Sequence, residues 1–199
     1  MNQATARDTA GHRSRLPGEP GVWLFIFLDL LIFSFIFYIF TFYRARDLAL
    51  FDASQQALNP VIGLVYTVLL LGSSWCVAMA VKLARGGTAI ETARRLITWA
   101  FCLGAAFAVL KFVEYTMKAQ AGIYPITNNF YMFYFCLTII HLVHVLFGLC
   151  LLRFMRNKMR ALPSSADPRD LALIESGASF WHMVDLVWIV LFALLYLRS

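Results

Sequence analysis

Ionisable side chains occur inside stretches of this chain that are otherwise apolar. Near the C-terminus, His182 and Asp185 lie in the run FWHMVDLVW over residues 180–188. On a helix they are one turn apart and face the same way, and Glu175 shares that face. Charged groups are costly in hydrocarbon, so ionisable residues there indicate a functional site. His182 and Asp185 could form an acid–base pair, or they could make hydrogen bonds between neighbouring helices.

Three further apolar stretches carry ionisable residues. Asp29 stands alone in LDLLI and must be neutral, paired or hydrated, which suggests a proton-linked or lipid-linked role. Lys111 and Glu114 are spaced i,i+3, which predicts an ion pair on one helix. His141 and His144 have the same spacing. They could bind haem or a metal, although no ExxH or HExxH motif accompanies them, or they could bond neighbouring helices.

The expected depth of these groups in the membrane places five of them in one layer. A rise of 1.5 Å per residue puts them about 10–16 Å from the inner edge of the membrane. These five are Asp29, His141, His144, His182 and Asp185. Lys111 and Glu114 fall near the outer surface instead. The estimated depths permit a polar cluster in the inner layer.

Five membrane-spanning helices are the elements that must position these residues. The 199-residue chain is 61% hydrophobic and 14% charged, with a mean hydropathy of +0.71. Windows of about 19 residues locate the helices. Their expected bounds are about 21–43, 60–82, 96–118, 129–152 and 176–197. Each can span a hydrocarbon core of about 30 Å, and lipid requires helical backbone there.

The short loops predict one compact bundle of antiparallel neighbours. The fold class is therefore an all-α integral membrane protein with five transmembrane helices. Residues 1–20 form a tail, and residues 21–199 form a single membrane domain. Asp167 and Pro168 also predict a short surface helix that runs through Leu173 into the last span.

The distribution of Lys and Arg predicts how the chain sits in the membrane. Twelve fall in the tail and in the second and fourth loops: Arg7, Arg13, Arg15, Lys82, Arg85, Arg94, Arg95, Arg153, Arg156, Lys158, Arg160 and Arg169. Four fall on the other side: Arg44, Arg46, Lys118 and Arg198. This asymmetry places the N-terminus in the cytoplasm and the C-terminus outside. Topology and anionic lipid thus account for the net charge of +6, and no nucleic-acid partner is expected.

The four cysteines give no sign of a metal or disulfide site. Cys76, Cys102, Cys136 and Cys150 all fall inside predicted spans, and no two form a CxxC motif. We expect small apolar packing residues, without a disulfide, zinc or iron–sulfur cluster.

Four motifs, in order, resemble subunit III of the haem–copper oxidases over almost the whole chain. The strongest begins at Glu175 and continues after six residues as HMVDLVW. The others are TIIHLVHV from Thr138, LGAAF from Leu103 with the later Lys111 and EY pair, and GVWLFI from Gly21 with Asp29. The chain is similar to the short five-helix form, which lacks the first two helices of longer members.

Some positions depart from the family pattern. Asp29 stands where a glutamate is usual, Ile139 replaces a glycine, and Lys111 often aligns with glutamine. The segment LPGEPGVW over 16–23 and the run NFYMFYF over 129–135 resemble most closely the NorE branch. That branch is encoded with nitric oxide reductases and is thought to assist them.

The resemblance implies a non-catalytic role in aerobic or denitrifying electron transport. Subunit III binds no haem or copper, docks on the catalytic subunit, holds phospholipid in a cleft, and helps sustain proton uptake. Asp29 takes the place of the acid in the lipid-cleft helix. The family's buried polar positions correspond to Glu114, His141, His144, Glu175, His182 and Asp185.

The resemblance further implies a set of partners and a location. The partner would be the catalytic subunit of a haem–copper oxidase or of a nitric oxide reductase. We expect bound phospholipid, no cofactor of its own and no catalytic residues, in a bacterial inner membrane. The residues alone leave two alternatives: a free-standing redox protein with histidine ligands, or a proton-pathway protein that uses Asp29, His182 and Asp185.

Overall fold

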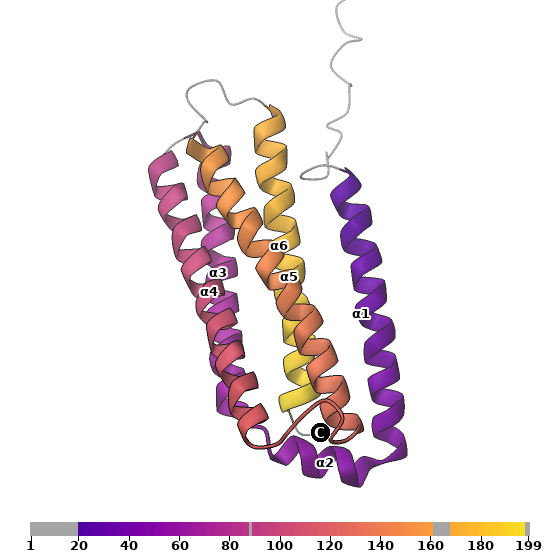
Figure 1. The fold of residues 1–199 in the computed structure, drawn as a ribbon. Coiled ribbons are helices and arrows are strands. Elements are labelled where there is room, and N and C mark those ends of the chain that lie inside the picture. Colours follow the sequence, from indigo (N-terminus) through magenta and orange to yellow (C-terminus); the bar gives the residue numbers. More distant parts are fainter. Residues whose placement is uncertain (1–19, 88, 161–167, 198–199) are drawn as a thin grey trace, which may run out of the picture.

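The structure, a computed structural model, describes residues 20–87, 89–160 and 168–197 (Figure 1). These residues form six helices. Their bounds are α1 (Pro20–Arg46), α2 (Leu48–Gln56), α3 (Pro60–Arg85), α4 (Ile90–Gln120), α5 (Asn129–Arg160) and α6 (Pro168–Tyr196). All except α2 are long and apolar enough to cross a membrane. The predicted all-α protein with five spans is confirmed. The predicted tail, apart from Pro20, and Asp167 lie outside the described residues.

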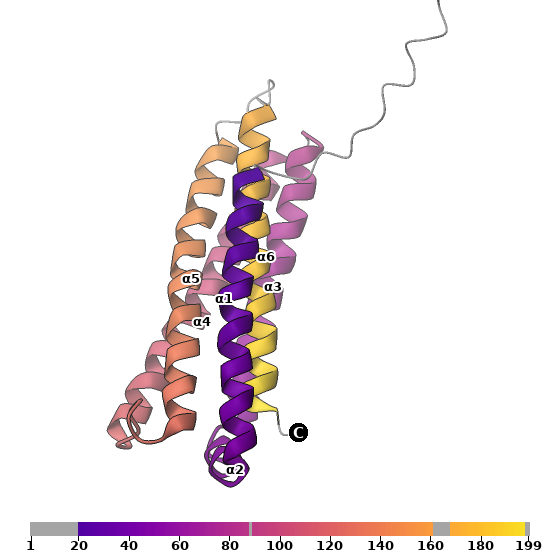
Figure 2. The ribbon, with the colours of Figure 1, turned by 90° about the vertical axis from the view of Figure 1, so that its right-hand side faces the viewer.

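The long helices alternate in direction, and four of them form a closed bundle (Figures 1 and 2). α3 packs on α4, α4 on α5, α5 on α6, and α6 back on α3. α1 lies against α5 and α6 from outside this bundle. Only 17% of the most apolar stretch of α1 is buried, compared with 56% for α6. The first helix is therefore peripheral, and most of its surface is left for lipid or a partner.

The helices extend further than hydropathy windows indicate. α4 begins at Ile90 and α5 continues to Arg160, through turns that carry basic side chains. Hydropathy detects only the part of a helix inside hydrocarbon, whereas backbone hydrogen bonding continues into the interface. For the same reason, the segment from Pro168 through Leu173 is the first part of α6 and not a separate surface helix. The expected helix through Leu173 is therefore present, and only its description as a short surface helix distinct from the last span was wrong.

The short helix α2 had no predicted counterpart, because nine residues of mixed polarity give no membrane-span signal. Asp47 caps it by accepting a hydrogen bond from the Leu50 amide at 3.2 Å. Gln55 then donates from Nε2 to the carbonyl oxygens of Leu194 at 3.4 Å and Leu197 at 2.8 Å. These carbonyls lie at the end of α6, where helix geometry leaves them without partners. α2 thus holds the C-terminal end of α6.

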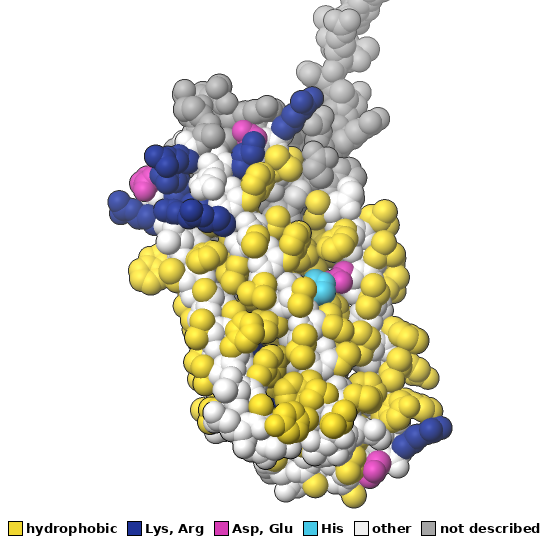
Figure 3. All heavy atoms as spheres, in the orientation of Figure 1, with side chains coloured by type: hydrophobic (Ala, Val, Ile, Leu, Met, Phe, Trp, Pro, Cys, Tyr) yellow, Lys and Arg dark blue, Asp and Glu magenta, His cyan; other side chains and the backbone are white. Residues whose placement is uncertain are grey.

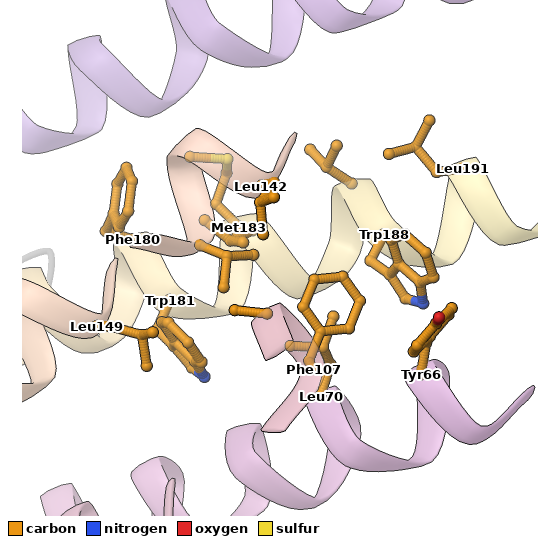
Figure 4. Close-up of a cluster of buried hydrophobic side chains, with 14 of the residues drawn as sticks. Tyr66, Leu70, Phe107, Leu142, Leu149, Phe180, Trp181, Met183, Trp188 and Leu191 are labelled. Atoms are coloured by element: carbon orange, nitrogen blue, oxygen red, sulfur yellow. The ribbon is translucent and has the colours of Figure 1, made fainter. Parts of the chain in front are cut away.

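Aromatic side chains fill the centre of the bundle. Figure 4 shows Trp181 and Trp188 extending from α6 to the same side, with Phe107 between them. A Cβ atom on Gly104 or Gly148 would lie 2.8 Å or 2.6 Å from the Trp181 indole. The two glycines of α4 and α5 therefore create the space that Trp181 occupies.

Surface charge divides the molecule into two ends. Hydrophobic side chains cover the middle of the face in Figure 3, and Lys and Arg gather where α3 and α5 end and α4 and α6 begin. We call this the basic end. Its residues are Lys82, Arg85, Arg94, Arg95, Arg153, Arg156, Lys158, Arg160 and Arg169. We call the opposite end, where α2 lies, the α2 end.

Candidate functional site

Asp29 of the peripheral helix α1 contacts His144 of α5. Asp29 Oδ1 lies 3.1 Å from His144 Nε2, and His144 Nδ1 lies 2.8 Å from the Ile140 carbonyl oxygen. A carbonyl only accepts, so Nδ1 carries a hydrogen, and Nε2 of a neutral ring is an acceptor. The contact to Asp29 then needs one more proton, either on the carboxyl or on Nε2. The geometry therefore defines a pair that holds one shared proton.

This pair lies near the surface of the α1–α5 groove. Asp29 is 8% exposed, and its second oxygen, Oδ2, has no hydrogen-bond partner in the described part of the chain. Phe33 packs edge-on against the His144 ring, and Phe180 stacks near it. Figure 3 shows a histidine beside an acidic side chain partway along an otherwise hydrophobic face. Whatever covers this face meets the polar pair.

An apolar cavity of about 320 Å³ adjoins the pair on the side toward the basic end. Phe180 contacts the His144 ring and also lines this cavity. The other lining residues come from α1, α5 and α6: Gly21, Val22, Phe25, Phe147, Leu151, Phe154, Met155, Leu173, Ser176 and Gly177. The groove thus combines one polar pair with a pocket suited to hydrocarbon.

The polar face of α6 is directed at α3. At the basic end, Arg85 donates from Nε to Glu175 Oε1 at 2.7 Å. Two turns deeper, His182 Nδ1 lies 2.5 Å from the Ser74 hydroxyl. Asp185 is 4% exposed, and neither of its oxygens makes a hydrogen bond among the described residues. The expected bond between helices is therefore made by His182, and Asp185 is left buried beside it.

His141 lies in a different environment from His144 and His182. It is 1% exposed, and its ring packs against those of Phe107 at 5.8 Å and Trp188 at 5.3 Å, which also contact each other. Neither ring nitrogen has a hydrogen-bond partner in the described ranges. His141 is thus a buried aromatic packing residue in this arrangement.

Lys111 and Glu114 lie in a network that reaches four helices. The fully buried Lys111 ammonium donates to Glu114 Oε2 at 2.9 Å, to Tyr196 at 3.1 Å and to Tyr134 at 3.3 Å. Glu114 also accepts from Tyr134 at 2.6 Å and from Tyr66 at 3.0 Å. The i,i+3 spacing predicted the pair alone. The three tyrosines were not predicted as partners, because they lie far from the pair and from one another in the chain.

The structure therefore divides the residues that were expected at one depth. Asp29 and His144 meet between α1 and α5, His182 and Asp185 face α3, and His141 packs among aromatic rings. No group of three or more His, Cys, Asp or Glu side chains is placed to hold a metal ion within the described residues. Cys76 is buried and the other cysteines are exposed, all of them as free thiols.

Comparison with known proteins places the chain in one family. The family model for cytochrome c oxidase subunit III matches residues 16–199. The chain is 29% identical to cytochrome c oxidase subunit 3 of Corynebacterium diphtheriae, over 88% of this chain and 85% of the relative. It is 28% identical to cytochrome bo(3) ubiquinol oxidase subunit 3 of Pseudomonas aeruginosa, over 90% and 84%. The corresponding Buchnera aphidicola protein is 27% identical, over 90% and 85%.

These bacterial relatives and the five apolar helices identify a multi-pass protein of the bacterial inner membrane. The family comprises non-catalytic subunits of haem–copper oxidase complexes, which have no redox centre of their own. Because the family model covers nearly the whole chain, the protein belongs to the cytochrome c oxidase subunit III family.

Proposed function

We propose that this chain docks on the catalytic subunit of a respiratory haem–copper complex, holds phospholipid beside it and supports its proton uptake. The observation that carries the proposal is the family match over residues 16–199. The peripheral α1 helix and the α1–α5 groove supply the surface on which partner and lipid would meet.

The lipid part of the proposal rests on the cavity between α1, α5 and α6. Its volume of about 320 Å³ and its almost wholly apolar lining suit an acyl chain. It lies toward the basic end, where Lys and Arg side chains would attract an anionic headgroup. Native mass spectrometry tests this part. Leu151→Trp should reduce retained lipid, and Leu186→Trp, on an exposed part of α6, should not. Equal lipid retention in both variants would contradict it.

The proton part rests on the Asp29–His144 pair. The two atoms that share the proton, Asp29 Oδ1 and His144 Nε2, are 3.1 Å apart. They lie at a surface that a docked partner would cover. When this pair releases its shared proton, Asp29 is left as a carboxylate beside a neutral imidazole, and the reverse step restores the proton to the contact. Glu114, Glu175, His182 and Asp185 lie elsewhere in the bundle and have no part in this pair.

The finer proposal is that the partner is the catalytic subunit of a nitric oxide reductase. It is supported by the NorE-like segments 16–23 and 129–135. In the structure the second of these packs α5 against α1 and α2, with Phe133 on Phe40 and Phe130 on Phe51. The named relatives are subunits of ubiquinol and cytochrome c oxidases, so a terminal oxidase is the alternative partner.

Co-purification tests the proposed function. The tagged full chain is isolated from its native membrane in mild detergent, with a tagged unrelated multi-pass protein as control, and bound proteins are identified by mass spectrometry. A nitric oxide reductase subunit would support the finer proposal, and an oxidase subunit would replace it with the alternative. A chain that purifies alone would overturn the accessory role. A Soret band from the chain alone would favour a redox protein with His141, His144 and His182 as ligands.

A further inference from the structure

We propose that Asp185 is a proton-exchanging carboxyl, connected to the aqueous phase at the basic end through Ser74, His182 and a hydrated cavity between α3 and α6. This site is distinct from the Asp29–His144 pair, which lies between α1 and α5, and it does not depend on which catalytic partner is bound.

The buried end of the route is Asp185 itself. The side chain is 4% exposed and both oxygens lack hydrogen-bond partners among the described residues. No ion pair in the described part of the chain includes it. An unpaired carboxylate is costly in such surroundings, so a carboxyl retained there either holds a proton or exchanges one.

The open end of the route is a cavity of about 280 Å³ at the basic end. Its polar lining consists of Lys82, Arg85, Glu175, Ser179 and His182. The volume far exceeds the space of about 10–15 Å³ that one water molecule needs, and the polar lining offers each water several partners. The Arg85–Glu175 pair at 2.7 Å lies on the same wall. A cavity with this lining is expected to be hydrated.

His182 connects the cavity with the buried carboxyl. It lines the cavity, and its Nδ1 is 2.5 Å from the Ser74 hydroxyl. Asp185 lies one turn beyond His182 on the same face of α6, where its carboxyl interacts with the Ser74 side chain. The three groups therefore follow one another from the hydrated wall into the bundle.

The chemistry of the relay balances. In one direction, the Asp185 carboxyl gives its proton to the Ser74 oxygen, the Ser74 hydroxyl gives its own to His182 Nδ1, and His182 Nε2–H releases a proton to water. Asp185 becomes a carboxylate, one proton appears in the cavity, and His182 stays neutral with its hydrogen moved to Nδ1. The reverse sequence reloads the carboxyl. Each of the three side chains can both donate and accept a hydrogen bond, as such a relay requires.

Infrared spectroscopy of the full chain, purified with whatever subunits accompany it, tests the relay. A protonated Asp185 gives a carboxyl C=O band that shifts in D₂O and is absent from Asp185→Asn. Ser74→Ala and His182→Phe should each slow the shift of this band by at least about tenfold. The matched control is Ser73→Ala. Ser73 bonds the Ala100 carbonyl and the Trp181 indole instead, so the rate should stay unchanged. Wild-type exchange in Ser74→Ala, or no band lost in Asp185→Asn, would overturn the proposal.

Thiol labelling tests the cavity independently of the relay. Ser179→Cys places a thiol on the cavity wall, and Leu186→Cys places one on an exposed part of the same helix farther from the basic end. A water-soluble, charged thiol reagent should add one extra adduct to Ser179→Cys, seen in the intact mass, and none to Leu186→Cys. No extra adduct on Ser179→Cys would show that the cavity is dry, and the route would be rejected.

Discussion

Single residues show how a membrane bundle accommodates ionisable groups by different means. Asp29 meets a histidine on another helix, Lys111 meets a glutamate on its own helix, and Asp185 has no hydrogen-bond partner among the described residues. In hydrocarbon, removing one member of each arrangement changes the free energy of unfolding by a different amount. Substitutions that keep or remove a single hydrogen-bonding function therefore distinguish among them.

Asp29→Asn should be tolerated better than Asp29→Leu. With the hydrogen of His144 on Nδ1, an asparagine amide can donate to Nε2 and keep the contact, whereas leucine leaves Nε2 without a donor. We expect Asp29→Asn to lower the free energy of unfolding by less than about 1 kcal/mol, and Asp29→Leu by more. Unfolding in detergent measures both. Equal losses would show that the amide does not replace the carboxyl in the contact with Nε2.

Glu114→Gln should be far more damaging alone than in combination with Lys111→Met. The single change leaves a buried ammonium whose other hydrogen bonds go to Tyr134 and Tyr196. Breaking a buried pair in this way costs about 3–5 kcal/mol, whereas replacing both members costs less. A double-mutant cycle on the free energy of unfolding measures the coupling. Additive effects of the two substitutions would show that the pair is not coupled.

The sequence predicted contacts within one helix and not those between helices. The spacing of Lys111 and Glu114 brings them together on any helix, and the 2.9 Å contact lies on α4. The Asp29–His144 contact depends on how α1 crosses α5, which neither residue's neighbours encode. Depth along the membrane normal constrains one coordinate only. Equal depth was therefore compatible with the separate environments of His141, His144 and His182.

At the scale of helices, hydropathy located all five spans and missed α2. Lipid requires the backbone of a long apolar stretch to be helical, so the composition of the stretch is enough to locate a span. α2 is stabilised by particular partners: its Asp47 cap, the ring contacts of Phe51, and the Gln55 bonds to α6. Such contacts exist only after the bundle has formed, so no local pattern indicates them.

Gln55→Ala should loosen the C-terminal end of α6. It removes hydrogen bonds to the Leu194 and Leu197 carbonyls, at a cost of about 1 kcal/mol. Hydrogen exchange followed by mass spectrometry should show faster exchange over residues 190–197. The control is Gln56→Ala, because Gln56 is exposed on the same helix. Similar exchange in the two variants would remove the role assigned to α2.

Packing between α4, α5 and α6 should be sensitive to one added methyl group. In Gly148→Ala the new Cβ would lie 2.6 Å from the Trp181 ring, which also fits closely against Gly104 and donates a hydrogen bond to Ser73, so its movement is restricted. Overpacking of this kind costs about 1–3 kcal/mol. Gly72→Ala is the matched control, because its nearest contact is 3.5 Å from Leu103. Thermal unfolding in detergent should separate the two variants, and equal melting temperatures would contradict the close fit.

At the scale of the whole molecule, the bundle has two chemically different ends joined by a hydrophobic surface. The basic end carries the Arg85–Glu175 pair, the Lys158–Asp170 pair and the mouth of the polar cavity. The α2 end carries the buried network around Lys111. Proton exchange through Asp185 would therefore occur with one side of the membrane only, and the orientation of the chain decides which side.

We expect the basic end to face the cytoplasm. The nine Lys and Arg residues that define it all lie within the described helices. Positive residues are retained on the cytoplasmic side during insertion. An alkaline phosphatase fused after Ser199 should be active, because the enzyme matures only outside the cytoplasm, and green fluorescent protein fused there should be dark. Fusions after Gly87, between α3 and α4, should give the opposite pattern. Fluorescence from the C-terminal fusion would invert the topology and direct the Asp185 route to the outer side.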